Sequence, residues 1–107
     1  MIKVVYHRKD NRLTIEGHAR SGEMGHDLVC SAASILAYTL AANVASMEEA
    51  GLLVDMSINM TPGDAEIMCN PNSSFKSTTT LTFDSICAGF NLLAHDYPDN
   101  ISYEIEM

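Results

Sequence analysis

The chain has 107 residues, of which 47% are hydrophobic and 19% are charged, and its formal net charge is −8. This composition is typical of one folded domain spanning residues 1–107, and it excludes a disordered chain, which would carry few apolar residues. Acidic residues outnumber Lys and Arg by 14 to 6, so binding to nucleic acid phosphates, which depends on clustered basic side chains, is not expected. The same negative charge would tolerate or attract a basic partner.

The first predicted element is an antiparallel hairpin. Residues 2–7 alternate with Ile2, Val4 and Tyr6 on one face, residues 12–17 alternate in the same way, and residues 9–11 between them favour a tight turn. This amino terminus lacks the basic and apolar blocks of a secretory signal, so we expect a cytoplasmic protein. Residues 19–26 have no period and include glycines and a serine, which predicts a mobile loop.

A long helix is predicted after this loop. Asp27 is a residue type that caps helix amino termini, and Gly51 follows two glutamates at the other end. Apolar residues recur at spacings of three and four along one stripe: Val29, Ala33, Leu36, Leu40, Val44 and Met47. Ile35 and several alanines widen the stripe, so we expect the helix to touch a second surface, such as another helix or subunit. Polar residues interrupt the uncharged stretch 28–47, which favours a buried helix of a soluble protein over a membrane span.

A second hairpin is predicted next. Alternation over residues 52–60 indicates a strand with four residues on one face: Val54, Met56, Ile58 and Met60. Residues 61–64 favour a turn into a second strand over residues 65–69, and residues 70–74 favour a loop.

The last predicted elements are a helix and a strand. The helix begins at residue 76 or 77 and ends at residue 95, with Leu81, Cys87 and Phe90 among its periodic apolar positions, and Pro98 stops it. Residues 101–106 alternate as a strand. The predicted fold class is therefore α/β: a single small domain in the order strand-strand-helix-strand-strand-helix-strand, with two helices packed on a mixed sheet.

Titratable side chains cluster around the start of the first helix, where His18, His26, Asp27 and Cys30 lie within 13 residues. Cys30 would be the third helical residue, where unpaired amides and the helix dipole favour an anion and lower the thiol pKa, although Asp27 opposes this in part. An imidazolium from His18, at the end of the second strand, would lower that pKa further. A cysteine on a helix is also commonly a small buried hydrophobe, and spacing alone leaves this interpretation open.

The remaining candidates for chemistry are weaker. The four clustered residues match no common zinc spacing, so we expect neither a metal nor another cofactor. Three cysteines without a C-x-x-C pair argue against a disulfide framework and indicate thiols. Cys69 and Cys87 fit the core, and His7 and His95 fit the surface or an edge.

Taken as a whole, residues 17–34 are Gly-His-Ala-Arg-Ser-Gly-Glu-Met-Gly-His-Asp-Leu-Val-Cys-Ser-Ala-Ala-Ser. This segment resembles the signature of the bacterial ribosomal-processing cysteine protease family, Prp, in which G-H-A precedes spaced glycines and then D-[I/L]-V-C-x-A-x-S. The resemblance extends over the rest of the chain, which has the family's length, its element order and a Tyr-Pro pair, Tyr97-Pro98, after the second helix. Ser31 and Ala33 depart mildly from the commonest family residues.

The resemblance implies a homodimeric cysteine endopeptidase that removes the N-terminal extension of a bacterial large-subunit ribosomal protein. It implies that Cys30 is the nucleophile and His18 the general base, with a thioester intermediate. The supporting positions are Asp27, Ser34, Gly17, Gly22 and Gly25. Asp27 either orients His18 or only caps the helix, Ser34 either hydrogen-bonds near the site or packs on backbone, and the loop glycines suit a flap over a peptide.

Two other functions remain open from the sequence. One is a non-catalytic dimeric binding module for a peptide or the ribosome, in which Cys30 and His18 only shape a groove. The other is a cysteine enzyme of another class, such as a thioesterase or an amidase.

Overall fold

The computed structural model describes residues 1–17 and 26–107, with residues 26 and 27 described by their backbone alone. Within these residues the elements follow the predicted order: β1 (Ile2–His7), β2 (Arg12–Glu16), α1 (His26–Glu49), β3 (Leu53–Thr61), β4 (Asp64–Pro71), α2 (Lys76–Asp96) and β5 (Ile101–Glu106). Short 3-10 turns, η1 (Arg8–Asp10) and η2 (Ser73–Phe75), precede β2 and α2. The mobile loop predicted over residues 19–26 lies outside the described residues, apart from residue 26, which begins α1.

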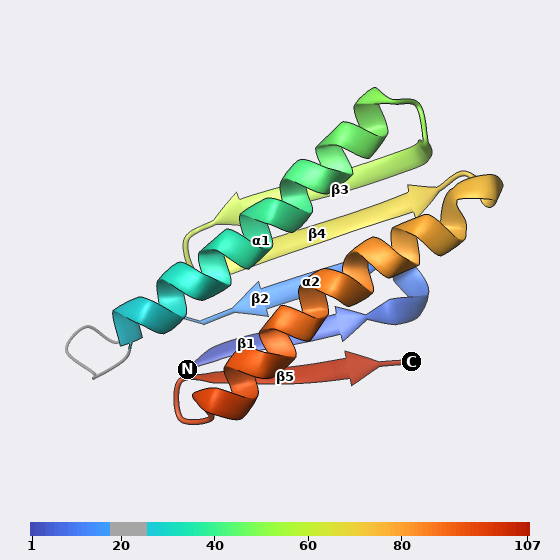
Figure 1. The fold of residues 1–107 in the computed structure, drawn as a ribbon. Coiled ribbons are helices and arrows are strands. Elements are labelled where there is room, and N and C mark those ends of the chain that lie inside the picture. The colour runs from blue at the N-terminus through green and yellow to red at the C-terminus, as the bar shows by residue number, and fades with distance from the viewer. Residues whose placement is uncertain (18–25) are drawn as a thin grey trace.

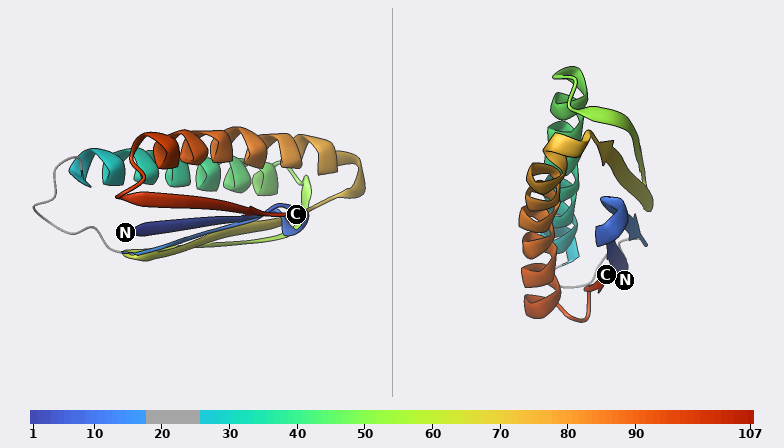
Figure 2. Two further views of the ribbon diagram at one scale, coloured as in Figure 1. Left: turned by 90° about the horizontal axis from the view of Figure 1, so that it is seen from below. Right: turned by 90° about the vertical axis from the view of Figure 1, so that its right-hand side faces the viewer.

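The described strands form one sheet in the order β3-β4-β2-β1-β5. β5 pairs in parallel with β1, whereas the β1–β2, β2–β4 and β3–β4 pairs are antiparallel, so the predicted mixed sheet is confirmed. Both helices lie side by side on one face of this sheet, as Figures 1 and 2 show. α2 packs next to β5, and α1 packs next to β3 and β4. The α/β class with two helices on a mixed sheet is therefore confirmed.

The core lies between the helix layer and the inner face of the sheet. Val4, Tyr6 and Leu13 point inward from β1 and β2, at 0 to 1% exposure. The predicted stripe of α1 meets them: Val29, Ala33, Leu40, Val44 and Met47 are buried and Leu36 is half-buried. Burying one such aliphatic or aromatic side chain contributes about 1.5 to 3 kcal/mol. Although α1 is long and apolar enough to cross a membrane, this face of it is covered by the sheet and α2.

One strand departs from the predicted pattern. Leu53, not Val54, faces the core, and Val54 is 64% exposed. The β3–β4 register shifts between Leu53 and Asp55, so Val54 is an extra residue on β3 that turns outward. The shift lies opposite Pro71, which has no N–H to give to the ladder. Met56, Ile58 and Met60 keep the predicted common face.

The second helix buries the predicted positions Cys87 and Phe90, but the predicted position of Leu81 is wrong. Leu81 is 65% exposed, and the buried positions are Thr79, Phe83, Cys87 and Phe90. The Thr79 hydroxyl donates a hydrogen bond of 2.9 Å to the Phe75 carbonyl, which satisfies this polar group inside the core. The helical period is therefore confirmed, and Thr79 occupies a core position that sequence hydrophobicity does not count as apolar.

A polar network fastens α2 to β1 beside this face. The Tyr6 hydroxyl donates to Asp84 Oδ1 at 2.8 Å, and Arg8 donates to both carboxylate oxygens of Asp84 at 3.2 and 3.1 Å. The hydrogen bond from Arg8 holds the pKa of Asp84 below its usual value, whereas burial raises the pKa of Tyr6. The network is a structural clamp between the two layers.

Candidate active site

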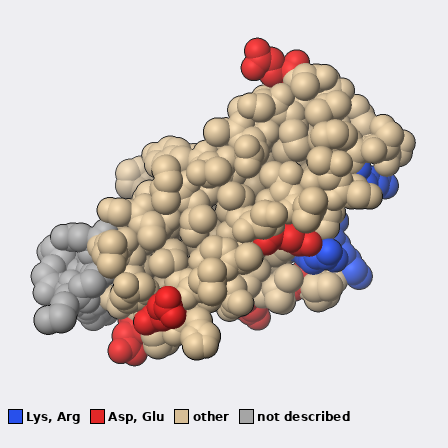
Figure 3. Space-filling view, viewed as in Figure 1, with Lys and Arg blue, Asp and Glu red and all other residues tan. Residues whose placement is uncertain are grey.

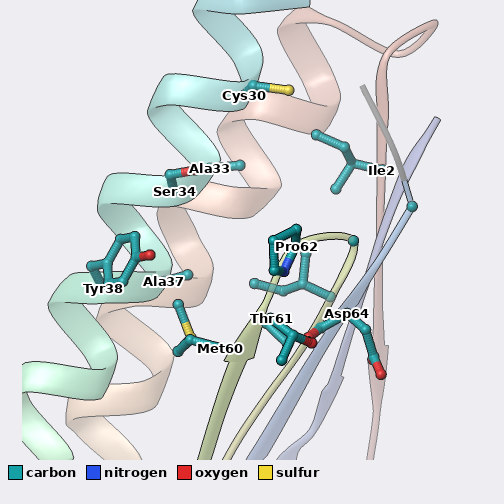
Figure 4. A pocket seen from close by; sticks show the side chains of 14 residues that line it. Ile2, Cys30, Ala33, Ser34, Ala37, Tyr38, Met60, Thr61, Pro62 and Asp64 are labelled. Atoms are coloured by element: carbon teal, nitrogen blue, oxygen red, sulfur yellow. The ribbon is translucent and has the colours of Figure 1, made fainter. Parts of the chain in front are cut away.

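The candidate site is a pocket of about 350 Å³ between the amino-terminal half of α1 and the turn that joins β3 to β4 (Figure 4). The helix contributes Cys30, Ala33, Ser34, Ala37 and Tyr38. The hairpin contributes residues 60–65, and Ile2, Ile15 and Gly17 complete the wall. Aliphatic and small side chains predominate, and such a lining suits an apolar or aromatic side chain of a ligand.

Cys30 lies at the end of this pocket nearest the start of α1. It is half-buried, and its sulfur points toward the side of the pocket where Ile2 lies (Figure 4). Because α1 begins at His26, Cys30 is the fifth residue of the helix, so its predicted place as the third residue is wrong. It follows the four residues whose amides lack helical partners, and the influence of the helix dipole falls off within the first turn.

The same helix start decides one question about Asp27. Its backbone is helical, at the second position of α1, so Asp27 is not the N-cap that the sequence suggested. The cap position precedes His26 and falls outside the described residues, as does the side chain of Asp27. Whether Asp27 orients His18 therefore stays a prediction.

Ser34 lies one helical turn after Cys30 and lines the same pocket. Its side chain is exposed, so the structure brings it to the wall of the pocket and not into the core. Tyr38 extends this face by one further turn and is 59% exposed. Sequence reasoning missed Tyr38, although its spacing of eight residues from Cys30 is that of a helical face.

Gly17 holds together three segments at the edge of the pocket. Its N–H donates to the Gly63 carbonyl in the β3–β4 turn at 3.1 Å, and its φ is +119°, which side chains with a Cβ rarely adopt. A Cβ here would overlap the Met1 carbonyl oxygen and lie 3.1 Å from Ile2 Cα. The predicted importance of Gly17 therefore has a local physical cause. His18, Gly22 and Gly25 lie outside the described residues.

The other cysteines are core residues, as predicted. Cys69 and Cys87 are 1% and 2% exposed, and neither forms a disulfide. Burial raises the pKa of Cys69 to about 11 and that of Cys87 to about 12, so both are protonated thiols at neutral pH. They are poor nucleophiles.

Comparison with known proteins agrees with the fold and with the segment that surrounds Cys30. A family model described as cysteine protease Prp matches residues 1–102. The crystal structure of SMU.848 from Streptococcus mutans is 25% identical, with a TM-score of 0.66 over 97% of this chain and 90% of that one. A ribosomal processing protease Prp from S. aureus in complex with a substrate peptide is 18% identical, with a TM-score of 0.70 over 98% and 97% of the two chains. The same protease with a covalently linked product peptide is 21% identical, with a TM-score of 0.68 over 98% and 97%. No curated protein matches the chain.

Proposed function

Because the chain belongs to the cysteine protease Prp family, and is a cysteine protease by that membership, we propose that it removes the N-terminal extension of a bacterial large-subunit ribosomal protein in the cytoplasm. The observation that carries the proposal is the half-buried Cys30 at one end of an apolar pocket, within the segment that resembles the family signature. The S. aureus relatives, described as ribosomal processing proteases bound to substrate and product peptides, support this choice of substrate. The net charge of −8 also suits a basic ribosomal protein.

In the proposed reaction Cys30 and His18 form the catalytic dyad. The Cys30 thiolate attacks the scissile carbonyl carbon, and the His18 imidazolium then gives its proton to the leaving amine as the C–N bond breaks. Water, deprotonated by His18, attacks the resulting thioester and releases the thiol and a carboxylate. Unpaired amides at the start of α1 are suitable donors to the oxyanion.

The position of Gly17 supports this pairing. Gly17 directly precedes His18 in the chain, and its Cα lies close to Ile2. The sulfur of Cys30 points toward Ile2 across the pocket (Figure 4). Gly17, the residue directly before His18, therefore lines the same pocket as Cys30.

We also propose that the enzyme is a homodimer that pairs through α1. Leu28, Ile35 and Tyr38 are 60%, 64% and 59% exposed, and their spacing of seven and three residues puts them on one face of the helix. The helix side of the molecule carries few charged side chains (Figure 3). A self-complementary contact along this helix would cover the apolar residues that widen its stripe.

The decisive experiment is proteolysis of the host's own ribosomal protein with its N-terminal extension. Purified full-length chain is incubated with that protein, and the products are identified by mass spectrometry. We expect loss of cleavage in Cys30→Ala and in His18→Ala, and retention in Cys69→Ala, whose thiol lies in the core away from the pocket. Persistent cleavage in both dyad variants would refute the dyad. Tight binding without cleavage by the wild type would favour the non-catalytic binding module.

A further inference from the structure

The strand β3 has a free edge that leads into the Cys30 pocket. β3 is the first strand in the sheet order, and within residues 1–17 and 26–107 it pairs with β4 alone. From Asp55 to Thr61 it has no bulge, and it has no proline or lysine, which are the usual means of blocking an edge. Such an edge is a template for another extended chain.

The backbone register shows which groups are available. The N–H of Cys69 in β4 donates to the Asn11 carbonyl on the β2 side at 3.1 Å, so Cys69 directs its backbone groups away from β3. Cys69 lies opposite Met56, which makes this a pair without mutual hydrogen bonds. Because the pattern alternates, Met56, Ile58 and Met60 direct their N–H and C=O groups outward from the sheet.

The side chains along this edge form two different surfaces. Met56, Ile58 and Met60 are half-buried and packed against the core under the helix layer. Ser57, Asn59 and Thr61 alternate with them and are exposed on the open face of the sheet. An added strand would place alternate side chains beside apolar and polar neighbours.

The edge and the nucleophile belong to one surface. Met60 and Thr61, at the end of β3, line the same pocket as Cys30 and Tyr38 (Figure 4). Eight residues of helix separate Tyr38 from Cys30, which corresponds to about 12 Å, or roughly four residues of extended peptide. The other edge strand, β5, contributes no residue to this pocket among those described.

We propose that the β3 edge binds the substrate polypeptide as an additional strand. The substrate residues about four or more positions from the scissile bond would pair with Met60, Ile58 and Met56. This inference rests on the proposed peptidase function. Continuity of the edge with the Cys30 pocket selects an extended peptide substrate over a second copy of the chain. Main-chain hydrogen bonds would then supply affinity that does not depend on sequence, and the pocket would supply selectivity.

The first test is a scan of substrate peptides in which one backbone N–H at a time is methylated. Beyond about the fourth residue from the scissile bond, we expect every second N-methyl group to lower kcat/KM by about fivefold, and the intervening ones to have little effect. A uniform loss, or no loss at these positions, would overturn strand addition. Cleavage of the unmodified peptide by the wild type and its absence in Cys30→Ala test the proteolytic function separately.

The second test changes the protein. Ile58→Pro removes an outward N–H without removing a bond to β4, and Ile58→Val keeps it as the matched control. Each variant is assayed with a long peptide and with a short one that lacks the distal residues. We expect the ratio of kcat/KM for long over short peptide to fall about fivefold in Ile58→Pro alone. An unchanged ratio, or dissociation of a dimer by Ile58→Pro, would contradict the proposal, and the peptide scan decides the matter if this variant does not fold.

Discussion

Replacing Gly17 by alanine should damage both the stability of the fold and the activity. Residue 17 has a φ of +119°, and adopting such a conformation costs a residue with a Cβ about 1 to 3 kcal/mol. The new Cβ would also overlap the Met1 carbonyl oxygen. Met1 is 57% exposed and can move, but the Ile2 N–H is held by the Asn100 carbonyl at 2.9 Å, so the shift would strain the start of β1. We therefore expect a total loss of about 2 to 4 kcal/mol in the free energy of unfolding.

Gly51→Ala is the matched control for this substitution. Gly51 has a φ of +76°, but a Cβ there would meet no atom within 4 Å. It should lose only the conformational cost, about 1 kcal/mol. Taking roughly 4 °C per kcal/mol for a domain of this size, the midpoint of thermal unfolding should fall by about 8 to 16 °C for Gly17→Ala and about 4 °C for Gly51→Ala.

The assay combines urea unfolding with peptide cleavage at a temperature where both variants are folded. Since residue 17 directly precedes the proposed base His18, kcat/KM should fall in Gly17→Ala and remain at the wild-type level in Gly51→Ala. Equal losses of stability in the two variants would show that the contact with Met1 carries no energy. Full activity in a folded Gly17→Ala variant would show that this residue does not position the proposed base.

Three further outcomes are expected. The pKa of Asp84 is lowered in the folded state, chiefly by its hydrogen bond from Arg8. Its contribution to stability is therefore present above about pH 4 and is lost as the pH falls through the pKa of the folded state. The free energy of unfolding in urea should depend less on pH between about 2 and 5 in Asp84→Asn than in the wild type. Ile35→Glu should shift the molar mass measured by light scattering from dimer to monomer. Leu92→Glu on α2 is the control and should leave the dimer intact, since Leu92 is 65% exposed and Ile35 is 64% exposed. The reverse result would place the interface on α2. The rate at which iodoacetamide alkylates Cys30 should reach half its maximum at a lower pH than the rate for a simple thiol, and His18→Ala should raise that pH. An unchanged value in His18→Ala would contradict the pairing of Cys30 with His18.

Much of the fold could be predicted because alternation and helical period report burial directly. The bounds of β1 and β5 were correct to the residue, and α2 begins at the first predicted position. Val54 was misplaced because the extra residue depends on what lies opposite it, namely Pro71 in β4. In α2 Leu81 was misplaced, because the core positions around it are Phe83 and Thr79, a polar residue whose hydroxyl has its own hydrogen-bond partner.

The site was predictable in part. The segment around Cys30 pointed to this half-buried thiol, but its sequence does not predict which residues form the opposite wall of the pocket. That wall is the β3–β4 turn, which reaches the site because β4 pairs with β2 and brings Gly63 to the backbone of Gly17. Contacts of this kind depend on the order of strands in the sheet, and one sequence does not encode that order in a local pattern.

The helix register changes the physical argument for an activated thiol. At the fifth position of α1, Cys30 gains less from the unpaired amides than a third residue would, so the imidazole of His18 must supply more of any decrease in its pKa. Selective alkylation of Cys30 over Cys69 would not demonstrate such a decrease. At about pH 6 a thiol with a pKa of about 11 is ionised to roughly 1 part in 10⁵, against roughly 3 parts in 10³ for an ordinary thiol, so burial of Cys69 alone produces strong selectivity. The informative measurement therefore compares the alkylation rate of Cys30, in the wild type and in His18→Ala, with that of a small thiol in solution. This comparison does not depend on the burial of the other cysteines.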